Sequence, residues 1–453
     1  MPKVKPDFLR ILRIGTVNTF PRTADYCLMW RYAFNFWQLS LRGSFALALG
    51  WLLFNSSMSR AETTNKRLIL PGARAQALGG AFTAVADDAS ASWYNPAGLG
   101  QFNGSGFSLT VNNYSRSHKD VAGRTTQSKI AENSSSIYPG FAGGHAKFGG
   151  IALGWSYFTV EQQNTDESQK LEIPASQTSG AYQYDRAELT SGNMIYAGLS
   201  TAIPLGKYIS LGVSEFYYRR QKQTALKERS LFESGIFYDS FVRQSTRNEG
   251  TLTTAGIMLK TSAVSLGLSA KIPKALSDKT DLETSSIIYA ETTPELSSET
   301  RQTHREDELI VRTWSLGMAF KPSTWALFSA DLIHYPATKT PWPNTGGFDT
   351  KDVTDWSVGI ELSAGSLVVD GGVFTNSSLV MTPKPSLVSS EPARIDYQGF
   401  SCGLGLKSKQ SETQIIMVRQ LGAGKTQLIQ GDLSLQDISI ETQSFSISSR
   451  YLF

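Results

Sequence analysis

Cysteine is almost absent from this chain of 453 residues, which contains only Cys27 and Cys402. If a leader that includes Cys27 is removed, as argued below, Cys402 remains alone and no intramolecular disulfide can form. Histidine is equally rare, and the four residues are far apart and lack the spacing of metal ligands: His118, His145, His304 and His334. The sequence therefore predicts no metal site, no cofactor and no fold held by cross-links.

Charged residues are also few, at 18% of the chain, against 40% hydrophobic residues, 11% aromatic residues and 39 glycines. The formal net charge of +4 arises in residues 1–61, which hold eight Lys and Arg against two Asp and Glu, so the remainder carries 35 against 37. The basic pI thus gives no reason to expect nucleic acid or an anionic membrane surface as a partner. A soluble protein so poor in charge would be unusual, whereas a barrel that shows every second residue to lipid has this composition.

Long apolar runs are missing too, and a helix that spans a bilayer takes about 20 such residues. The ten-residue run Phe45 to Phe54 follows Arg42 and precedes Ser59-Arg60-Ala61, which is the pattern of a signal peptide with its cleavage site. We therefore expect residues 1–61 to form a signal-peptide region cleaved near Ala61, with Met29 as an alternative start. A retained membrane anchor is the competing interpretation.

The remainder of the chain alternates between apolar and polar residues. In Val264 to Ile272 the even positions are apolar, whereas the odd positions are Ser265, Gly267, Ser269 and Lys271. This period of two predicts a strand with one polar and one apolar face. The apolar face would form the core of a β-sandwich or meet lipid in a membrane barrel, and the alternation alone does not choose between them.

The lengths of the connections favour the barrel. Candidate strands from Gly106 onward meet at six tight joints, at 147–150, 204–207, 261–264, 321–324, 363–366 and 408–412. Between the joints lie seven long polar stretches, near 118–135, 162–190, 222–248, 275–305, 336–352, 377–395 and 422–435. Short turns that alternate with long loops are typical of outer-membrane barrels, and this count predicts about fourteen antiparallel strands.

Both ends of the expected mature chain resemble one family. The segment Gly72 to Leu99 reads GARAQALGGAFTAVADDASASWYNPAGL, and the chain ends Arg450-Tyr451-Leu452-Phe453. These segments resemble the N-terminal hatch and the terminal aromatic strand of the FadL-like outer-membrane transporters of long-chain fatty acids and other hydrophobic compounds. The resemblance implies an all-β transmembrane barrel over 106–453 with a plug, or hatch, at 62–105 in its lumen. It also implies a place in the cell outer membrane of a Gram-negative bacterium, among outer-membrane lipid, with insertion by the barrel-assembly machinery.

The function implied by the resemblance is passive uptake of hydrophobic molecules, long-chain fatty acids in particular. The steps would be capture at the outer loops, transfer to a lumenal pocket, movement of the hatch and lateral exit. The alternative is a hatch-containing barrel that serves protein interaction or secretion. An enzyme is not expected, because the G-x-S-x-G match at Gly399 to Gly403 lies on an alternating strand and lacks the strand-to-helix turn that a nucleophile requires.

Four groups of residues are the candidate sites. The hatch group is Asn95, Pro96, Ala97, Asp87, Asp88, Gly79 and Gly80. It includes a turn fixed by side-chain hydrogen bonding and the preset φ of proline, and it would either move or fill the lumen permanently. Apolar residues in polar loops would capture ligand or cap one another: Leu231, Phe232, Phe237, Phe241, Ile287 and Ile288. Cations on polar strand faces are candidates for binding a carboxylate in the lumen: Lys271, Arg312 and Lys407. Pro139 and Gly140 predict a kink or gap between the second and third strands.

Overall fold

The computed structural model describes residues 65–102, 104–121, 130–173, 182–232, 237–290, 293–304, 311–338, 350–384, 393–426 and 435–453. The expected signal-peptide region 1–61 lies outside these residues. Among the described residues, no helix is long and apolar enough to cross a membrane.

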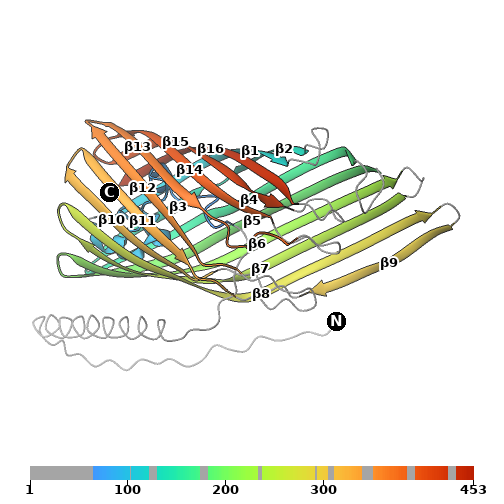
Figure 1. Ribbon diagram of the computed structural model, residues 1–453. Coiled ribbons are helices and arrows are strands. Elements are labelled where there is room, and N and C mark those ends of the chain that lie inside the picture. Colours follow the sequence, from blue (N-terminus) through green and yellow to red (C-terminus); the bar gives the residue numbers. More distant parts are fainter. Residues whose placement is uncertain are drawn as a thin grey trace, which may run out of the picture. The chain divides into compact units, whose positions relative to one another are not determined.

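Fourteen antiparallel strands close into a barrel within the described part of the chain (Figure 1). The ring runs from β10 through β16, continues with β1 and then β3 to β8, and closes where Leu268 of β8 pairs with Leu316 of β10. Its strands are β1 (Gly106–Val121), β3 (Phe141–Phe148), β4 (Ile151–Ile173), β5 (Tyr182–Leu205), β6 (Ile209–Phe232), β7 (Phe237–Lys260), β8 (Val264–Ala290), β10 (Thr313–Ser323), β11 (Ala326–Tyr335), β12 (Val353–Ala364), β13 (Leu367–Asn376), β14 (Arg394–Lys407), β15 (Ser411–Thr426) and β16 (Gln436–Leu452). Two further strands extend the wall: β2 (Ile130–Tyr138) pairs with β1, and β9 (Thr293–His304) pairs with β8. The expected count of fourteen is confirmed.

The short turns lie at the predicted joints, all at one end of the barrel. The turn between β3 and β4 contains Gly149, and that between β12 and β13 contains Gly365; both have a positive φ, near 60°, which glycine adopts without strain. The first residue of β1 and the last residues of β16 lie at the same end, where Gly106 pairs with Leu452.

The prediction of long loops at 162–190, 222–248 and 275–305 is wrong, because most of these residues belong to β4 to β9. Residues 209–232 and 237–260 pair along their whole length as β6 and β7, up to the pair Leu231 and Phe237. Leu231 and Phe241, predicted as loop residues, therefore lie on paired strands. Beyond the lipid-facing band a strand can be polar on both faces, so its alternation of hydropathy disappears although its backbone pairing continues. The strands β4 to β8 consequently extend well beyond β10 to β13 at the end opposite the short turns (Figure 1).

The apolar face of each strand lies on the outside of the barrel. On β8 the side chains of Leu266 and Leu268 are 42% and 44% exposed, whereas Ser265 and Ser269 on either side of them are buried. The alternation therefore belongs to a transmembrane barrel and not to a sandwich, whose apolar faces would be covered.

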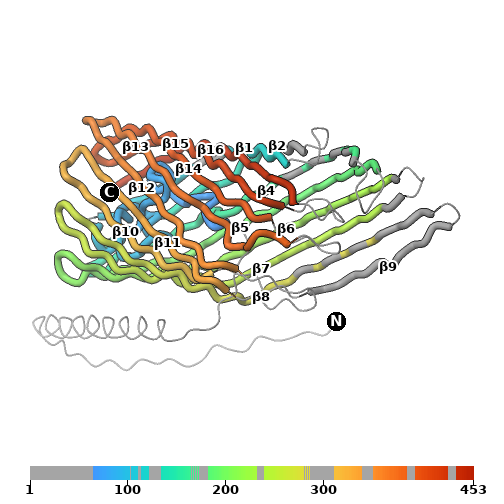
Figure 2. Tube along the Cα trace, in the orientation of Figure 1, coloured from blue at the N-terminus to red at the C-terminus, as the bar shows by residue number. Residues whose placement is uncertain are grey.

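Residues 65–102, called the inner segment below, lie inside the barrel (Figure 2, in blue). The inner segment contains two short helices and a 3₁₀ helix: α2 (Ala73–Ala77), α3 (Ala91–Tyr94) and η1 (Pro96–Gln101). Leu78, Phe82 and Leu99 are fully buried and share one apolar cluster with Ala202 and Met258 of the wall. Small residues let this backbone pass close to the strands around it.

Inward glycines and hydroxyl groups of the wall provide the seat for the inner segment. A Cβ atom added at any of seven glycines on consecutive parts of the wall would meet the inner segment: Gly212, Gly256, Gly267, Gly317, Gly359, Gly372 and Gly403. Wall serines donate to carbonyl groups of the inner segment, as Ser210 does to Ala97 at 2.7 Å and Ser269 does to Tyr94 at 2.8 Å. On β11, Asp331 accepts from the Phe82 and Thr83 nitrogens. The seat extends from β6 to β14.

Candidate ligand cavity and the interrupted wall

A cavity of about 590 Å³ lies between the inner segment and the barrel wall. Leu68, Leu70, Trp93 and Tyr94 line it from the inner segment. Its apolar and aromatic lining from the wall is Tyr138, Val160, Met194, Tyr196, Leu252, Val311, Ile333, Tyr335, Ile395, Tyr397, Ile438 and Ile440. Polar and charged side chains, among them Arg67, Glu161 and Lys271, line the rest of the cavity. A concave site of this volume that combines apolar and polar walls suits a small hydrophobic ligand with a polar group.

Trp93 connects the cavity to an aromatic cluster of the wall. Its ring centroid lies 5.0 Å from that of Phe158, 5.2 Å from that of Tyr196 and 5.9 Å from that of Phe216, mostly edge to face. Edge-to-face contacts at these distances are favourable beyond the area they bury. The inner segment is thus anchored to β4, β5 and β6 through one indole.

Lys271 is the predicted cation that the structure places in the cavity. The alternation of β8 directs it inward, and its Nζ lies 3.3 Å from the centroid of the Trp93 ring. No acidic residue of the described chain forms an ion pair with Lys271. A cation over an aromatic face keeps part of its stabilisation without an anion, and it stays available to one.

The other two predicted cations do not line the cavity. Arg312 precedes β10 by one residue, and Thr313, which follows it, is the inward one. Lys407 ends β14 beside a short turn and is exposed. Of the three predicted cations, only Lys271 therefore lines the cavity. Arg312 lies just before the start of β10, and Lys407 lies at the end of β14 beside a short turn.

The wall is interrupted where β2 gives way to β3. Residues 106–110 of β1 pair with β3 and residues 113–121 pair with β2, so Pro139 and Gly140 separate two halves of what would be one strand. The ladder between β3 and β4 ends at Phe141 and Phe158, apart from one bond of 3.3 Å from the Thr159 nitrogen to the Gly140 oxygen. Among the described residues, β2 forms no ladder with β4.

The cavity extends to this interruption. Five consecutive residues of β4, 160–164, line the cavity, together with Ser134, Ser136 and Tyr138 of β2. A strand that is paired on both sides presents only every second residue to one face. The edge of β4 itself is therefore exposed to the cavity.

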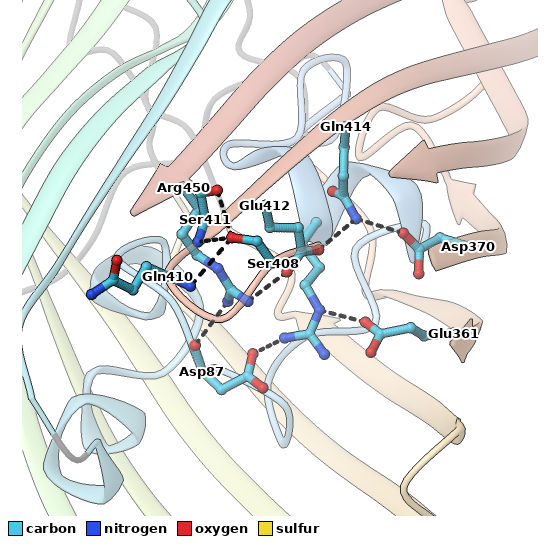
Figure 3. A network of polar contacts seen from close by, with 10 residues as sticks. Asp87, Glu361, Asp370, Ser408, Gln410, Ser411, Glu412, Gln414 and Arg450 are labelled. Atoms are coloured by element: carbon cyan, nitrogen blue, oxygen red, sulfur yellow. Dashed lines mark hydrogen bonds and ion pairs between the residues drawn. The ribbon is translucent and has the colours of Figure 1, made fainter. Parts of the chain in front are cut away.

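On the side of the short turns, an ion-pair network ties the inner segment to the wall (Figure 3). Arg74 of α2 binds Asp87 of the inner segment and Glu361 of β12. Nearby, Arg450 of β16 binds Glu412 of β15 at 2.7 Å, and Gln414 donates to Asp370 at 2.9 Å. Burial favours the neutral form of Asp87, but Arg74 and further cations outweigh it and lower the pKa of that carboxyl.

The predicted hatch residues form the turns that hold the inner segment together. The Asn95 carboxamide accepts from the Ala97 nitrogen and donates to the Thr83 and Ile257 carbonyls, so it caps η1 and binds β7. Asp88 accepts from the nitrogen and the hydroxyl of Ser90, and burial raises its pKa. Gly79 and Gly80 have φ values of 64° and 80°, a region that other residues rarely adopt.

The chain matches no protein-family model and no curated protein. Solved structures nevertheless share its architecture. A FadL homologue of Pseudomonas aeruginosa is 13% identical, with a TM-score of 0.56 over 88% of this chain and 100% of the other. The toluene transporter TodX of P. putida is 12% identical, with a TM-score of 0.58 over 88% and 99%. The toluene transporter TbuX of Ralstonia pickettii is 12% identical, with a TM-score of 0.56 over 85% and 99%.

The fold is that of the FadL-type barrels. At 12% to 13% identity the similarity establishes the fold and leaves the ligand open. Ser401, the serine of the G-x-S-x-G match, is one of the wall residues that seat the inner segment, since its hydroxyl donates to the Ala77 carbonyl at 2.8 Å.

The predicted capture residues lie away from the cavity where the structure describes them. Leu231 of β6 and Phe241 of β7 are 43% and 38% exposed and do not line it. The side chains of Phe232, Phe237, Ile287 and Ile288 lie outside the described residues. Capture at this hairpin stays a prediction.

Sequence reasoning missed most of the residues that line the cavity. Met194, Tyr196 and Leu252 occupy inward positions that elsewhere carry Ser or Gly, as do Phe216 and Tyr218 beside them. The signal that could have revealed them is a large residue on the otherwise polar face of an alternating strand. Such a residue fits inside the barrel only where the inner segment does not pass close to the wall.

Proposed function

We propose that this protein is an outer-membrane channel for passive uptake of hydrophobic molecules, with long-chain fatty acids as the first candidate. The observation that carries the proposal is the cavity, lined in part by aromatic and aliphatic side chains, that reaches the edge of β4 where no ladder with β2 forms. A ligand in it would contact aromatic and aliphatic side chains, and Lys271 would be available to a carboxylate. The names of the FadL homologue and the toluene transporters support the same class of cargo.

The proposed route ends sideways. The interruption at Pro139 and Gly140 would let a ligand leave between β2 and β4 into the membrane, because no ladder has to be broken there. The inner segment closes the way along the barrel axis, since its core residues Leu78, Phe82 and Leu99 are fully buried. The proposal includes a shift of the inner segment at its contact with β4, which would widen the path from the cavity to the interruption.

A reversible cross-link between the inner segment and the wall tests this shift. The hydroxyl oxygens of Ser92 in α3 and Ser156 in β4 lie 2.8 Å apart, so S92C/S156C, made in a C402S background, should form a disulfide with little distortion. Cells that carry this variant should take up radiolabelled oleate at less than a tenth of the rate seen after reduction. Capture and folding should be unchanged.

The control links two strands of the wall. The hydroxyl oxygens of Thr413 in β15 and Ser449 in β16 lie 3.2 Å apart, and these strands are already paired, so T413C/S449C should leave uptake unchanged in both redox states. Equal uptake by oxidised and reduced S92C/S156C would reject movement of the inner segment. No uptake of oleate or toluene above that of cells lacking the protein, in any variant, would reject transport.

A further inference from the structure

A basic patch lies on the outer surface of β6, β7 and β8, although the bulk charge of the chain gives no hint of it. We define the basic patch as Arg219, Arg247, Lys274 and Lys279. On β8 it directly follows the lipid-facing apolar run Val264 to Ile272, and it lies toward the end of the barrel opposite the short turns. The patch therefore begins where the hydrocarbon band ends.

The four side chains face outward because the residues beside them face inward. Tyr218, Asn248 and Asp278 are at most 3% exposed, so the strand alternation directs Arg219, Arg247 and Lys279 to the outside. Lys274 is exposed and pairs with Thr251, which lies on the outward face of β7 together with Arg247 and Glu249.

The patch has more cations than the protein neutralises. Glu249 is the acid within it, at 3.6 Å from Arg219 and 2.6 Å from Arg247. Lys274 and Lys279 have no ion pair with any described residue, and the next outward acid along β8 is Asp281.

Two of the cations are direct cross-strand partners. Arg247 pairs with Lys279 in the ladder between β7 and β8. Like charges directly opposite each other destabilise a pair of strands. An anion that contacts both side chains would remove this repulsion.

On the opposite side of the barrel, outward cations form ion pairs with acidic residues. β15 lies seven strands from β7 in either direction around the ring. Each outward cation of that sector has an acidic partner: Arg419 with Glu441 at 3.0 Å, Lys425 with Asp437 at 2.6 Å, and Arg394 with Asp396 at 2.9 Å. The excess of positive charge is therefore a local property of β6 to β8.

We propose that the basic patch binds the phosphate groups of a membrane lipid whose acyl chains lie along the apolar run of β8. Phosphate oxygens accept charge-assisted hydrogen bonds from ammonium and guanidinium groups, and these are stronger than neutral ones. The apolar side chains Leu266 and Leu268 supply the surface for the chains of the same molecule. The site is on the outside of the wall and is independent of transport through the lumen.

The test is the affinity of the purified, folded barrel for lipid A, a glycolipid with two phosphate groups, measured by titration in mixed micelles with native mass spectrometry. K274Q/K279Q should bind at least about tenfold more weakly than wild type, as expected from losing two charge-assisted bonds. The control R419Q/K425Q removes two paired cations from the opposite side and should leave the affinity unchanged. K274R/K279R should retain the affinity of wild type.

Two results would overturn the proposal. One is equal weakening, or none, in K274Q/K279Q and in the control, once heat-modifiability shows that both barrels are folded. The other is complete competition by millimolar inorganic phosphate, which would mean that the patch holds a free anion and not a lipid. Lipid A without its two phosphate groups should bind at least about tenfold more weakly than intact lipid A, because it cannot form the charge-assisted bonds.

Discussion

Two sides of the barrel differ in how closely they contact the inner segment. From β6 round to β14 the wall approaches it so closely that glycines are needed, and Glu361 of β12 binds its Arg74. At β2 and β4 the wall lacks its ladder and borders the cavity. Strand pairing is complete from β6 to β14, and it is interrupted between β2 and β4, at one edge of the cavity.

This difference arises from very few residues. Strands on the held side have inward Gly, Ser or Asp at the level of the inner segment, and the open side has one proline and one glycine in the middle of a strand. Proline removes a ladder donor, and glycine offers no side chain to pack, so pairing ends there. Substitutions on each side can therefore test the comparison separately.

The largest expected effect is on the held side, at Arg74. Arg74→Met leaves the partly buried carboxylates of Asp87 and Glu361 without their cation, which should lower the free energy of unfolding by about 3 kcal/mol, the low end for a buried ion pair. Arg419→Met removes an arginine from an exposed pair with Glu441 and should cost only about 0–1 kcal/mol. Urea unfolding of the two variants in the same detergent gives the comparison. Similar losses in both would mean that the network does not hold the inner segment.

The sequence predicts the barrel much better than it predicts the contacts inside it. Alternation and turn residues are local, so the fourteen strands and their six short turns could be located in advance. The hairpin of β6 and β7 could not, because its outer part is polar on both faces and has no alternation to detect.

The inside depends on residues far apart in the chain. The hydrogen bond from Ser401 to Ala77 joins residues 324 positions apart, and no local sequence pattern predicts it. Lys271 was predictable because its strand alternates strictly, whereas Arg312 required the exact start of β10. The interruption at Pro139 and Gly140 was predictable because proline acts on its own backbone.

A smaller effect is expected from crowding the seat at Gly372. A side chain there would overlap the backbone of Gly79, so Gly372→Val should displace the inner segment or strain β13, at about 1–3 kcal/mol. Gly371 is the matched control, since a Cβ atom there meets only Ile360, at 3.5 Å. Limited proteolysis within residues 65–102 should be faster in Gly372→Val than in Gly371→Val. Equal resistance would show that the close approach is not needed to seat the inner segment.

The smallest change in stability, and the sharpest test of the open side, is expected at Pro139 and Gly140. Pro139→Val with Gly140→Val restores a backbone donor and a β-branched side chain, so the ladder between β3 and β4 can continue into β2. We expect stability to change by no more than about 1 kcal/mol, the span of strand propensities. Amide exchange in residues 160–164 of β4 should slow at least tenfold, and oleate uptake should fall with it.

The control for this closure is Pro204→Val in β5. Pro204 already pairs with Ser210 in an uninterrupted ladder, so its replacement should alter neither exchange at 160–164 nor uptake. If exchange at β4 slows in the Pro139 and Gly140 variant while uptake stays at the level of wild type, the wall has closed and the ligand leaves by another route. If exchange does not slow, the interruption is set by the cavity and the inner segment behind it, and not by these two residues.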